Sequence, residues 1–285
     1  MKEGEKESRA IVVGAAGRMG GRVIQALKET PSIKLCGAVE RPDHPSLGKD
    51  IGELHGLGKM GVLLEGELRK GEGDVIINFS SPKASMESLE LAHRMGLAIV
   101  IGTTGLGPEQ IERMKELSKG VRCVFSPNMS VGMNVMFRVV QEVAQVLGSE
   151  YDVEILEAHH HLKKDSPSGT AVKLGELIAK ALGRDFSRVG VYGRKGMVGE
   201  RTQEEIGMQV IRAGDLVGEH TVLFGGIGER LEIIHRAHSR DNFVRGAIRA
   251  ALWVVHQPNG LYDMQDVLGL KKQKKGERSK VMHFR

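Results

Sequence analysis

Residues 157–170 hold the densest group of side chains that could do chemistry. The run reads Glu-Ala-His-His-His-Leu-Lys-Lys-Asp-Ser-Pro-Ser-Gly-Thr. Histidine and lysine can act as general acids, and histidine changes its charge near neutral pH. Ser168, with Pro167 before it, marks a helix start, and the N–H groups at such a start bind carboxylates or phosphates. The run therefore predicts a cationic pocket for a small anion that must also receive a proton.

Three consecutive histidines can also suggest a metal site. If residues 159–161 continue a strand, however, His160 points away from His159 and His161, so one metal cannot readily recruit all three. No accompanying set of cysteine or carboxylate ligands is evident either. We therefore expect no metal here, and a solvated loop without function is the remaining alternative on the residues alone.

A glycine-rich turn is the second chemical feature. Residues 14–20 read Gly-Ala-Ala-Gly-Arg-Met-Gly between a predicted strand and a predicted helix. Its G-x-x-G-x-x-G spacing is a variant of the dinucleotide fingerprint, in which glycines bring backbone close to a pyrophosphate at a helix N-terminus. Glu40, 20 residues beyond Gly20, ends the next predicted strand and can accept hydrogen bonds from a ribose. The alternative is a structural turn without a ligand.

Arg41 follows Glu40 and bears on which dinucleotide is used. An arginine there can stack on adenine or pair with a 2′-phosphate, so NADH and NADPH are both expected to bind. The Glu40 carboxylate would repel that phosphate, which tilts the preference toward NADH. Two later segments that end predicted strands, residues 101–105 and 126–129, could line the same crevice, although either is as consistent with a plain turn.

The elements that must position these residues fall into two groups. Alternating strand and helix patterns in the first half predict an α/β fold with a Rossmann-like parallel sheet. The later part predicts a second, α+β domain with a mixed sheet. The first group comprises strands at 10–15, 33–39, 62–64, 74–79, 98–101 and 121–125 and helices at 19–29, 82–95 and 108–117. The second comprises helices at 131–147 and 168–182 and strands at 153–158, 208–211, 221–224 and 231–235, before a last helix at 242–255.

Bulk properties exclude several classes. Hydrophobic residues at 40% and charged residues at 27% are ordinary for a globular protein. Much of the net charge of +5 lies in a basic tail after Leu270, to which we assign no role, and no aromatic-plus-basic nucleic-acid motif appears. No apolar run approaches the ~20 residues of a membrane span, and the charged start predicts no secretory signal. Cys36 and Cys123 are expected to be buried, reduced thiols, which fits a cytoplasmic protein.

The 157–170 run resembles the E-x-H-H-x-x-K-x-D-x-P-S-G-T signature of the 4-hydroxy-tetrahydrodipicolinate reductase (dihydrodipicolinate reductase) family. The similarity spans nearly the whole chain. It includes the segments GAAGRMG, IGTTG, SPNMSVGMNV, RAGDLVGEH, GERLEIIHRAHSR and GLYDMQDVL.

This resemblance implies NADH- or NADPH-dependent reduction of a cyclic dicarboxylate in lysine and diaminopimelate biosynthesis. His159 would be the proton donor and Lys163 its partner acid and carboxylate contact. The substrate's carboxylates would be held by His160, Gly169 and Thr170, with Ser168 at the helix start. The residues expected to contact the dinucleotide are Gly14, Ala15, Ala16, Gly17, Arg18, Met19, Glu40, Arg41, Gly102, Thr103, Thr104, Ser126, Pro127, Asn128 and Met129.

The resemblance also implies an organisation. Residues 1–130 with 241–285 would form the dinucleotide-binding domain, and residues 131–240 would form the domain that binds substrate and assembles a homotetramer through its sheet. The expected partner is a small dicarboxylate, with no nucleic acid or membrane. Three alternatives stay open: a non-catalytic NAD(H) sensor, a related dehydrogenase of another small carboxylate, and a nucleic-acid binder that uses the basic tail.

Overall fold

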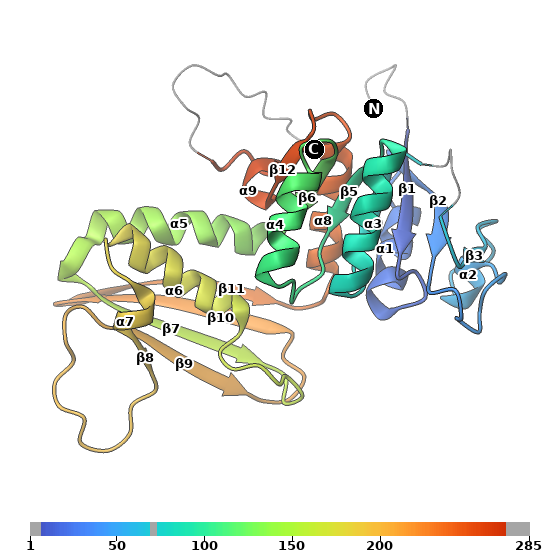
Figure 1. Cartoon of the computed structure of the whole chain (residues 1–285). Coiled ribbons are helices and arrows are strands. Elements are labelled where there is room, and N and C mark those ends of the chain that lie inside the picture. Colours follow the sequence, from blue (N-terminus) through green and yellow to red (C-terminus); the bar gives the residue numbers. More distant parts are fainter. Residues whose placement is uncertain (1–6, 69–72, 272–285) are drawn as a thin grey trace. The chain divides into compact units, whose positions relative to one another are not determined.

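The computed structural model describes residues 7–68 and 73–271, which form two compact units (Figure 1). The first unit takes Met1–Val131 and Asp241–Arg285, and the second takes Gly132–Arg240. The sequence placed this boundary one residue earlier. The basic tail after Lys271 lies outside the described residues.

A seven-stranded sheet forms the centre of the first unit, and every neighbouring pair in it is parallel. This confirms the predicted Rossmann-like sheet. Across the sheet the strands are β12 (Gly260–Tyr262), β6 (Arg122–Phe125), β5 (Ala98–Ile101), β4 (Val75–Asn78), β1 (Ser8–Val13), β2 (Ile33–Val39) and β3 (Leu64–Glu65).

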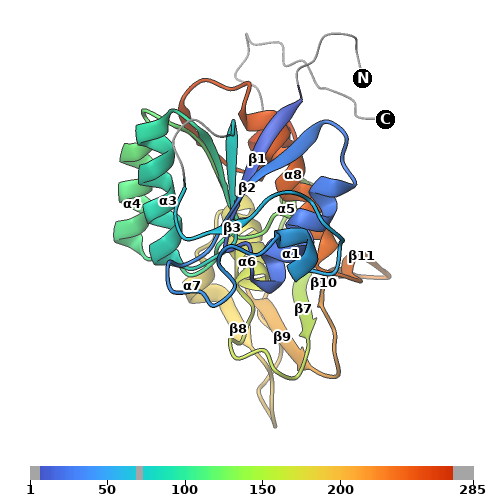
Figure 2. The same cartoon turned by 90° about the vertical axis from the view of Figure 1, so that its right-hand side faces the viewer.

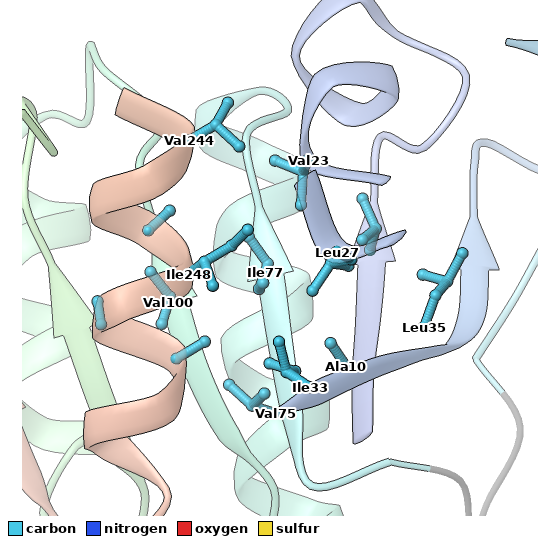
Figure 3. Close-up of a cluster of buried hydrophobic side chains, with 14 of the residues drawn as sticks. Ala10, Val23, Leu27, Ile33, Leu35, Val75, Ile77, Val100, Val244 and Ile248 are labelled. Atoms are coloured by element: carbon cyan, nitrogen blue, oxygen red, sulfur yellow. The ribbon is translucent and has the colours of Figure 1, made fainter. Parts of the chain in front are cut away.

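Helices cover both faces of this sheet (Figure 2). On one face lie α1 (Arg18–Lys28) and α8 (Asp241–Val254), and on the other lie α3 (Pro82–Met95) and α4 (Pro108–Leu117). Successive side chains of β1 point to opposite faces of the sheet. Ala10 and Val12 belong to the apolar cluster on one face, and Ile11 belongs to the cluster on the other face. In Figure 3, Val23 and Leu27 of α1 and Val244 and Ile248 of α8 meet the β-sheet side chains of the first cluster. The returning C-terminal helix is thus part of the first unit's core.

Local signals fix several of these boundaries. Helix α3 begins at Pro82, where the Ser81 side chain accepts a hydrogen bond from Ala84 N, and it ends at Gly96 with a left-handed φ of 70°. Helices 82–95 and 108–117 occur as predicted, since proline suits a first helical turn. The short elements β12 and α9 (Met264–Val267) carry too little periodicity to be predicted.

Residues 41–68 contain elements that differ from the prediction. The expected strand at 62–64 is shifted, because β3 covers Leu64–Glu65. The segment before it holds the short helix α2 (Ile51–Leu54) and is organised by one carboxylate. Asp50 accepts backbone N–H bonds from Gly52, Glu53, Met60 and Gly61. Because the Asp50 carboxylate organises this loop, the segment has no hydrophobic periodicity from which its structure could be predicted.

The second unit is built on a five-stranded mixed sheet in the order β11-β10-β7-β9-β8. The pairs β7–β9 and β8–β9 are parallel, and β10 is antiparallel to both β7 and β11. The strands are β7 (Asp152–His159), β8 (Gly190–Tyr192), β9 (Ile206–Arg212), β10 (Gly218–Gly226) and β11 (Glu229–Ala237). This confirms the predicted mixed sheet.

Two long helices, α5 (Val131–Leu147) and α6 (Gly169–Ala181), cover one face of that sheet (Figure 1). The short helices η1 (Gly148–Glu150) and α7 (Phe186–Val189) follow them in the chain. Phe137 of α5, Leu174 of α6 and Phe224 of β10 belong to one buried cluster. Within residues 7–68 and 73–271, no helix is long and apolar enough to span a membrane.

We expect Gly246→Ala to destabilise the first unit. A Cβ at Gly246 of α8 would lie 1.8 Å from the carbonyl oxygen of Met129. Alanine favours a helix by about 1 kcal/mol over glycine, yet overpacking here should cost about 1–3 kcal/mol or more. Urea unfolding measures the net change, with exposed Arg245→Ala on the same helix as the control. A Gly246→Ala protein as stable as wild type would contradict this packing.

Candidate active site

The carboxyl ends of the parallel strands gather at one edge of the first unit's sheet. Strand β1 has β2 on one side and β4 on the other, so the strand order reverses beside β1. Ligands of open α/β sheets bind outside the strand ends at such a point. The turns predicted to bind the cofactor all leave strands at this edge.

The glycine-rich turn after β1 is shaped for a close ligand. Gly14 has a φ of +74°, and Gly14 N and Ala15 N both donate to Val39 O, at 2.9 and 3.1 Å. A Cβ on Gly20 would lie 2.2 Å from Gly14 O, so only glycine fits there. Helix α1 then begins without a side-chain cap and without an acid in its first turn. Its positive N-terminal end therefore suits a dinucleotide's pyrophosphate.

Glu40, at the end of β2, is tied to this turn. Its carboxylate accepts hydrogen bonds from Ala16 N at 3.3 Å and from Arg41 N at 3.1 Å. The Arg41 side chain pairs with Asp43 at 3.5 Å, and both side chains are well exposed. The spacing of Glu40 from the glycines thus places its carboxylate beside the turn, as a ribose contact requires.

A cleft of about 670 Å³ opens at this edge. Of the predicted residues, Gly14, Gly17, Glu40 and Arg41 line it. Sequence reasoning missed other lining residues, chiefly Phe79, Ser80 and Ser81, which leave β4. A sequence signal for these residues exists, because residues 79–81 join the predicted strand at 74–79 to the predicted helix at 82–95. The turns at residues 14–20 and 101–105 are predicted from the same strand-to-helix arrangement.

A buried amide holds this missed turn. Asn78 is fully buried, and its Oδ1 accepts hydrogen bonds from Ser80 N at 3.0 Å and from Ser85 Oγ at 3.1 Å. The hydroxyl of Thr103 donates to the same oxygen at 3.3 Å. The Gly102 backbone approaches the Phe79 ring so closely that a Cβ would lie 2.1 Å from it. The turns after β4 and β5 are therefore built as one piece.

Some predicted cofactor residues point their side chains inward. Thr103 is engaged with Asn78 and Ser85, while Ala15 and Met129 are buried in the apolar core. The Ser126 hydroxyl donates to Asn128 O at 2.8 Å. At these positions a cofactor contact has to come from the backbone. The residues left with exposed or half-exposed side chains are Ala16, Arg18, Met19, Thr104, Pro127 and Asn128.

In the second unit, a buried carboxylate that sequence reasoning missed organises the predicted catalytic segment. Glu157 Oε2 lies 2.6 Å from His159 Nδ1 and accepts from Arg212 Nη1 at 2.8 Å. Its Oε1 accepts from Arg212 Nη2 at 2.9 Å and from Ser168 N at 2.8 Å. Burial acts to raise the pKa of Glu157, but the bonds from His159, Arg212 and Ser168 outweigh it and lower the pKa to about 2. The carboxylate is thus ionised and fully paired.

Ser168 has a structural role at the start of α6. Its N–H donates to Glu157, its Oγ accepts from Ala171 N at 3.2 Å, and it is buried. The same Oγ lies 3.2 Å from His220 Nε2. The Ser168 side chain is therefore engaged within the protein, and Gly169 and Thr170 are the first helical residues.

His220 is a further histidine that the sequence did not single out. It is 4% exposed, and its ring meets the His159 ring edge-on with centroids 5.3 Å apart. Burial, with a smaller effect of His159, lowers the pKa of His220 to about 3. His220 is accordingly neutral at physiological pH.

The expectation that residues 159–161 continue a strand is wrong. Strand β7 ends at His159, and residues 160–161 turn to pair with the loop at 214–216 through His160 N to Leu216 O and His161 N to Gly214 O. The alternation of a strand therefore does not apply to them. Among the described residues, no three His, Cys, Asp or Glu side chains are grouped as a metal site would require.

The surroundings of His160 are cationic, as expected for an anion pocket. Burial lowers the pKa of His160, and the positive groups of Arg240, His159 and Lys163 lower it further. Lys163 Nζ pairs with Asp165 at 2.9 Å. His160 Nδ1 is buried and has no hydrogen-bond partner in the described part of the chain. A polar atom in that position suits a ligand group.

Neither cysteine forms a disulfide within the described residues and both lie in strands, but Cys36 is only half-buried, contrary to the expectation. Burial raises the pKa of the Cys123 thiol to about 12, and the Cys36 thiol contacts Ala10 O at 3.3 Å. Cys123 therefore stays protonated, which argues against an enzyme that uses it as a nucleophile.

Comparisons with known proteins match both halves of the chain to one family. The family model for the dihydrodipicolinate reductase N-terminus matches residues 8–129, and the model for the C-terminus matches residues 132–268. The 4-hydroxy-tetrahydrodipicolinate reductase of Syntrophus aciditrophicus is 57% identical over 92% of this chain and 99% of its own. The enzyme of that name from Geobacter sp. (strain M21) is 55% identical with the same coverage.

Solved structures agree in fold. Dipicolinate-bound dihydrodipicolinate reductase from Paenisporosarcina sp. TG-14 has a TM-score of 0.68 at 21% identity and covers 92% of this chain and 99% of its own. An amine dehydrogenase from Mycobacterium smegmatis has a TM-score of 0.55 at 14% identity and covers 90% and 94%. At these identities the likeness concerns the fold.

We expect His220 to make stability fall as the pH is lowered. Its folded pKa of about 3 lies below the unfolded value of 6.5, so the unfolded state binds the extra proton between these values. This contribution is present above pH 6.5 and is lost as the pH falls toward 3. His220→Gln should therefore lose less thermal stability than wild type between pH 7.5 and pH 5, with exposed His256→Gln as the control. Equal losses in the wild type and His220→Gln would be evidence against a neutral, buried His220.

Proposed function

The chain belongs to the dihydrodipicolinate reductase family, and we propose that it reduces 4-hydroxy-tetrahydrodipicolinate with a reduced nicotinamide dinucleotide, as a step of lysine and diaminopimelate biosynthesis. One observation carries the proposal. The signature's histidine and lysine occur together in a cationic segment of a chain that is 57% identical to a curated reductase over nearly all of that protein.

The proposed substrate is a cyclic dicarboxylate, which explains the charge of the pocket. Lys163, His160 and the α6 start at Gly169 and Thr170 would hold its two carboxylates. Anchoring both carboxylates fixes the ring's orientation, and such positioning can remove several kcal/mol from a barrier. Lys163 would exchange its exposed partner Asp165 for a substrate carboxylate.

Loss of water from 4-hydroxy-tetrahydrodipicolinate, on the enzyme or beforehand, gives a ring in which a carbon–nitrogen double bond is conjugated to a carbon–carbon double bond. The reaction then adds one hydride and one proton to that ring. When bound, the nicotinamide supplies the hydride, which adds to the far end of the conjugated system. The chain's own residues supply the proton that the shifted electron pair then requires: His159 donates it, with Lys163 as partner acid. The product is the tetrahydro compound, and His159 regains a proton from solvent.

We propose NADH as the preferred nucleotide, with NADPH also accepted. Glu40 and Glu67 both line the cleft of the first unit, and their negative charge disfavours a 2′-phosphate there. Arg41, which could offset them, shares its charge with Asp43. The exposure of Arg41 and Asp43 makes that pairing weak, so Arg41 remains able to accept NADPH.

The proposal includes a homotetramer in the cytoplasm, with neither nucleic acid nor membrane as partner. Met208 of β9 belongs to the apolar cluster under α5 and α6, and Ile233 of β11 packs against it, so strand alternation puts Ile211 and Ile234, which are 48% and 43% exposed, on the opposite face. Apolar side chains at this level of exposure on an uncovered sheet suit a subunit contact. Two cysteines that form no disulfide within the described residues fit a reducing compartment.

The first test is oxidation of NADH and of NADPH with substrate generated from pyruvate and aspartate semialdehyde. We expect substrate-dependent oxidation that is faster with NADH, and a loss of about 10²–10⁴-fold in kcat for His159→Gln, because a general acid contributes on that scale. Nucleotide binding without turnover of this substrate would instead favour a sensor or a dehydrogenase of another carboxylate. Unchanged turnover in His159→Gln would remove His159 from the mechanism.

Lys163→Ala should lower kcat and raise the KM for the dicarboxylate together, since one ammonium group serves both proton supply and carboxylate binding. The neighbouring Lys164, which is exposed, provides the matched control as Lys164→Ala. Steady-state kinetics with saturating NADH separates the two constants. Wild-type constants in Lys163→Ala would exclude the assigned role.

A further inference from the structure

We propose that Glu157 is a positioning residue that fixes His159 in the tautomer with its proton on Nδ1, and that Gly218 keeps the other ring nitrogen, Nε2, open as the atom that delivers the proton. The inference rests on the proposed function, because it concerns the residue assigned there as proton donor.

The first observation is that the Glu157 carboxylate is fully buried and fully hydrogen-bonded. Its side chain has no exposed surface, and each carboxylate oxygen accepts two hydrogen bonds. Arg212 spans both oxygens, which is the geometry that holds a carboxylate most firmly. This guanidinium also donates to Asp165 O at 2.7 Å, so it is itself fixed by the signature loop. Glu157 is therefore an immobile reference point for the ring that it contacts.

The second observation concerns protons. An ionised carboxylate can only accept hydrogen bonds, so the 2.6 Å contact requires a proton on His159 Nδ1. A neutral His159 then carries its lone pair on Nε2, and a protonated His159 carries its second proton there. The proton that can leave is thus always the one on Nε2.

The third observation is the space around Nε2. Within the described residues, Nε2 of His159 has no hydrogen-bond partner. Gly218, the first residue of β10, lies beside it, and a Cβ there would be 3.0 Å from Nε2. Any larger side chain would begin with that carbon against the reacting nitrogen. The absence of a side chain at Gly218 thus leaves room for a substrate atom.

Charge balances along the proposed step. Before transfer, the imidazolium of His159 faces the Glu157 carboxylate, which also pairs with Arg212. The Nε2–H bond breaks, its proton forms a bond to the substrate carbon that holds the electron pair, and the ring is left neutral with Nδ1–H still bonded to Glu157. Glu157 neither gains nor loses a proton, and solvent later restores the proton on Nε2.

Glu157→Gln tests the positioning role. Glutamine keeps the shape but can present an NH₂ group to His159, which favours the wrong tautomer. We expect kcat to fall by about 10–100-fold or more, the scale for partners that orient a functional histidine. The dissociation constant for NADH, followed by nucleotide fluorescence, should not change. The matched control is Glu154→Gln on the same strand, where the carboxylate pairs with Arg194 and Arg201 outside this group.

A spectroscopic measurement reports the tautomer without any turnover. Solid-state ¹⁵N spectra of histidine-labelled protein distinguish protonated from unprotonated ring nitrogens, and the His159 signals are identified by their absence in His159→Gln. We expect a protonated Nδ1 and an unprotonated Nε2 in neutral His159 of the wild type. A mixture of tautomers should appear in Glu157→Gln.

Gly218→Ala tests the open nitrogen separately. Its methyl group should lower kcat while the ¹⁵N signature of Nδ1 and the affinity for NADH stay as in wild type. Gly225→Ala is the control on the same strand, because a Cβ there meets only Leu223 at 3.5 Å. This variant also keeps the proposal testable if Glu157→Gln fails to fold.

The outcomes distinguish a failure of the proposed reductase function from a failure of the roles assigned to Glu157 and Gly218. A wild-type protein without reductase activity would overturn the proposed function, while the ¹⁵N spectra would still report on Glu157. An active wild type, with wild-type kcat and a single Nδ1–H tautomer in Glu157→Gln, would overturn the positioning role. Wild-type kcat in Gly218→Ala would overturn the assignment of Nε2 as the delivering atom.

Discussion

The pair of buried Glu157 and half-buried Arg212 is the interaction on which the proposed chemistry of this protein depends. Burying a carboxylate is unfavourable unless charge and hydrogen bonds compensate for it, and removing one partner of such a pair typically costs about 3–5 kcal/mol. Here the compensation comes from three separate elements: the end of β7, the end of β9 and the start of α6. The loop that carries Lys163 joins two of these elements, so its ends are held by the same carboxylate.

The dinucleotide edge of the first unit is organised on a different principle. Its shape comes mostly from backbone and from places where a side chain cannot fit, as at Gly20 and Gly102. Asn78 is the counterpart of Glu157, although it is neutral and links neighbouring turns through hydroxyl groups. A neutral hub suits a site for a negatively charged diphosphate, because it adds no repulsion.

The distribution of charge around His159 follows from burial. His220 lies against His159 but is neutral, since burial disfavours the charged imidazolium and outweighs the opposing effect of the Glu157 carboxylate on its pKa. The positive charge of the pocket therefore comes from groups that reach solvent, such as Lys163, whose side chain is 20% exposed. This arrangement packs His159, the proposed proton donor, beside His220 without placing a buried cation there.

The sequence by itself determined most of the longer elements and pointed to the candidate reactive groups, whereas only the tertiary structure decided how those groups are held. Hydrophobic period and proline placed helices such as α3 and α5, because these signals act within a few residues of chain. The glycine spacing predicted a turn that the structure ties to Glu40, and its binding of a dinucleotide stays a prediction. The signature run supplied His159 and Lys163. The role of Glu157 could not be read in this way, since Arg212 stands 55 residues away and meets it only because β7 and β9 are neighbours. For the same reason the sequence did not show that Ser168 and Thr103 point inward. The partners of a buried polar group depend on which strands are neighbours in the sheet, and a local sequence pattern does not contain that information.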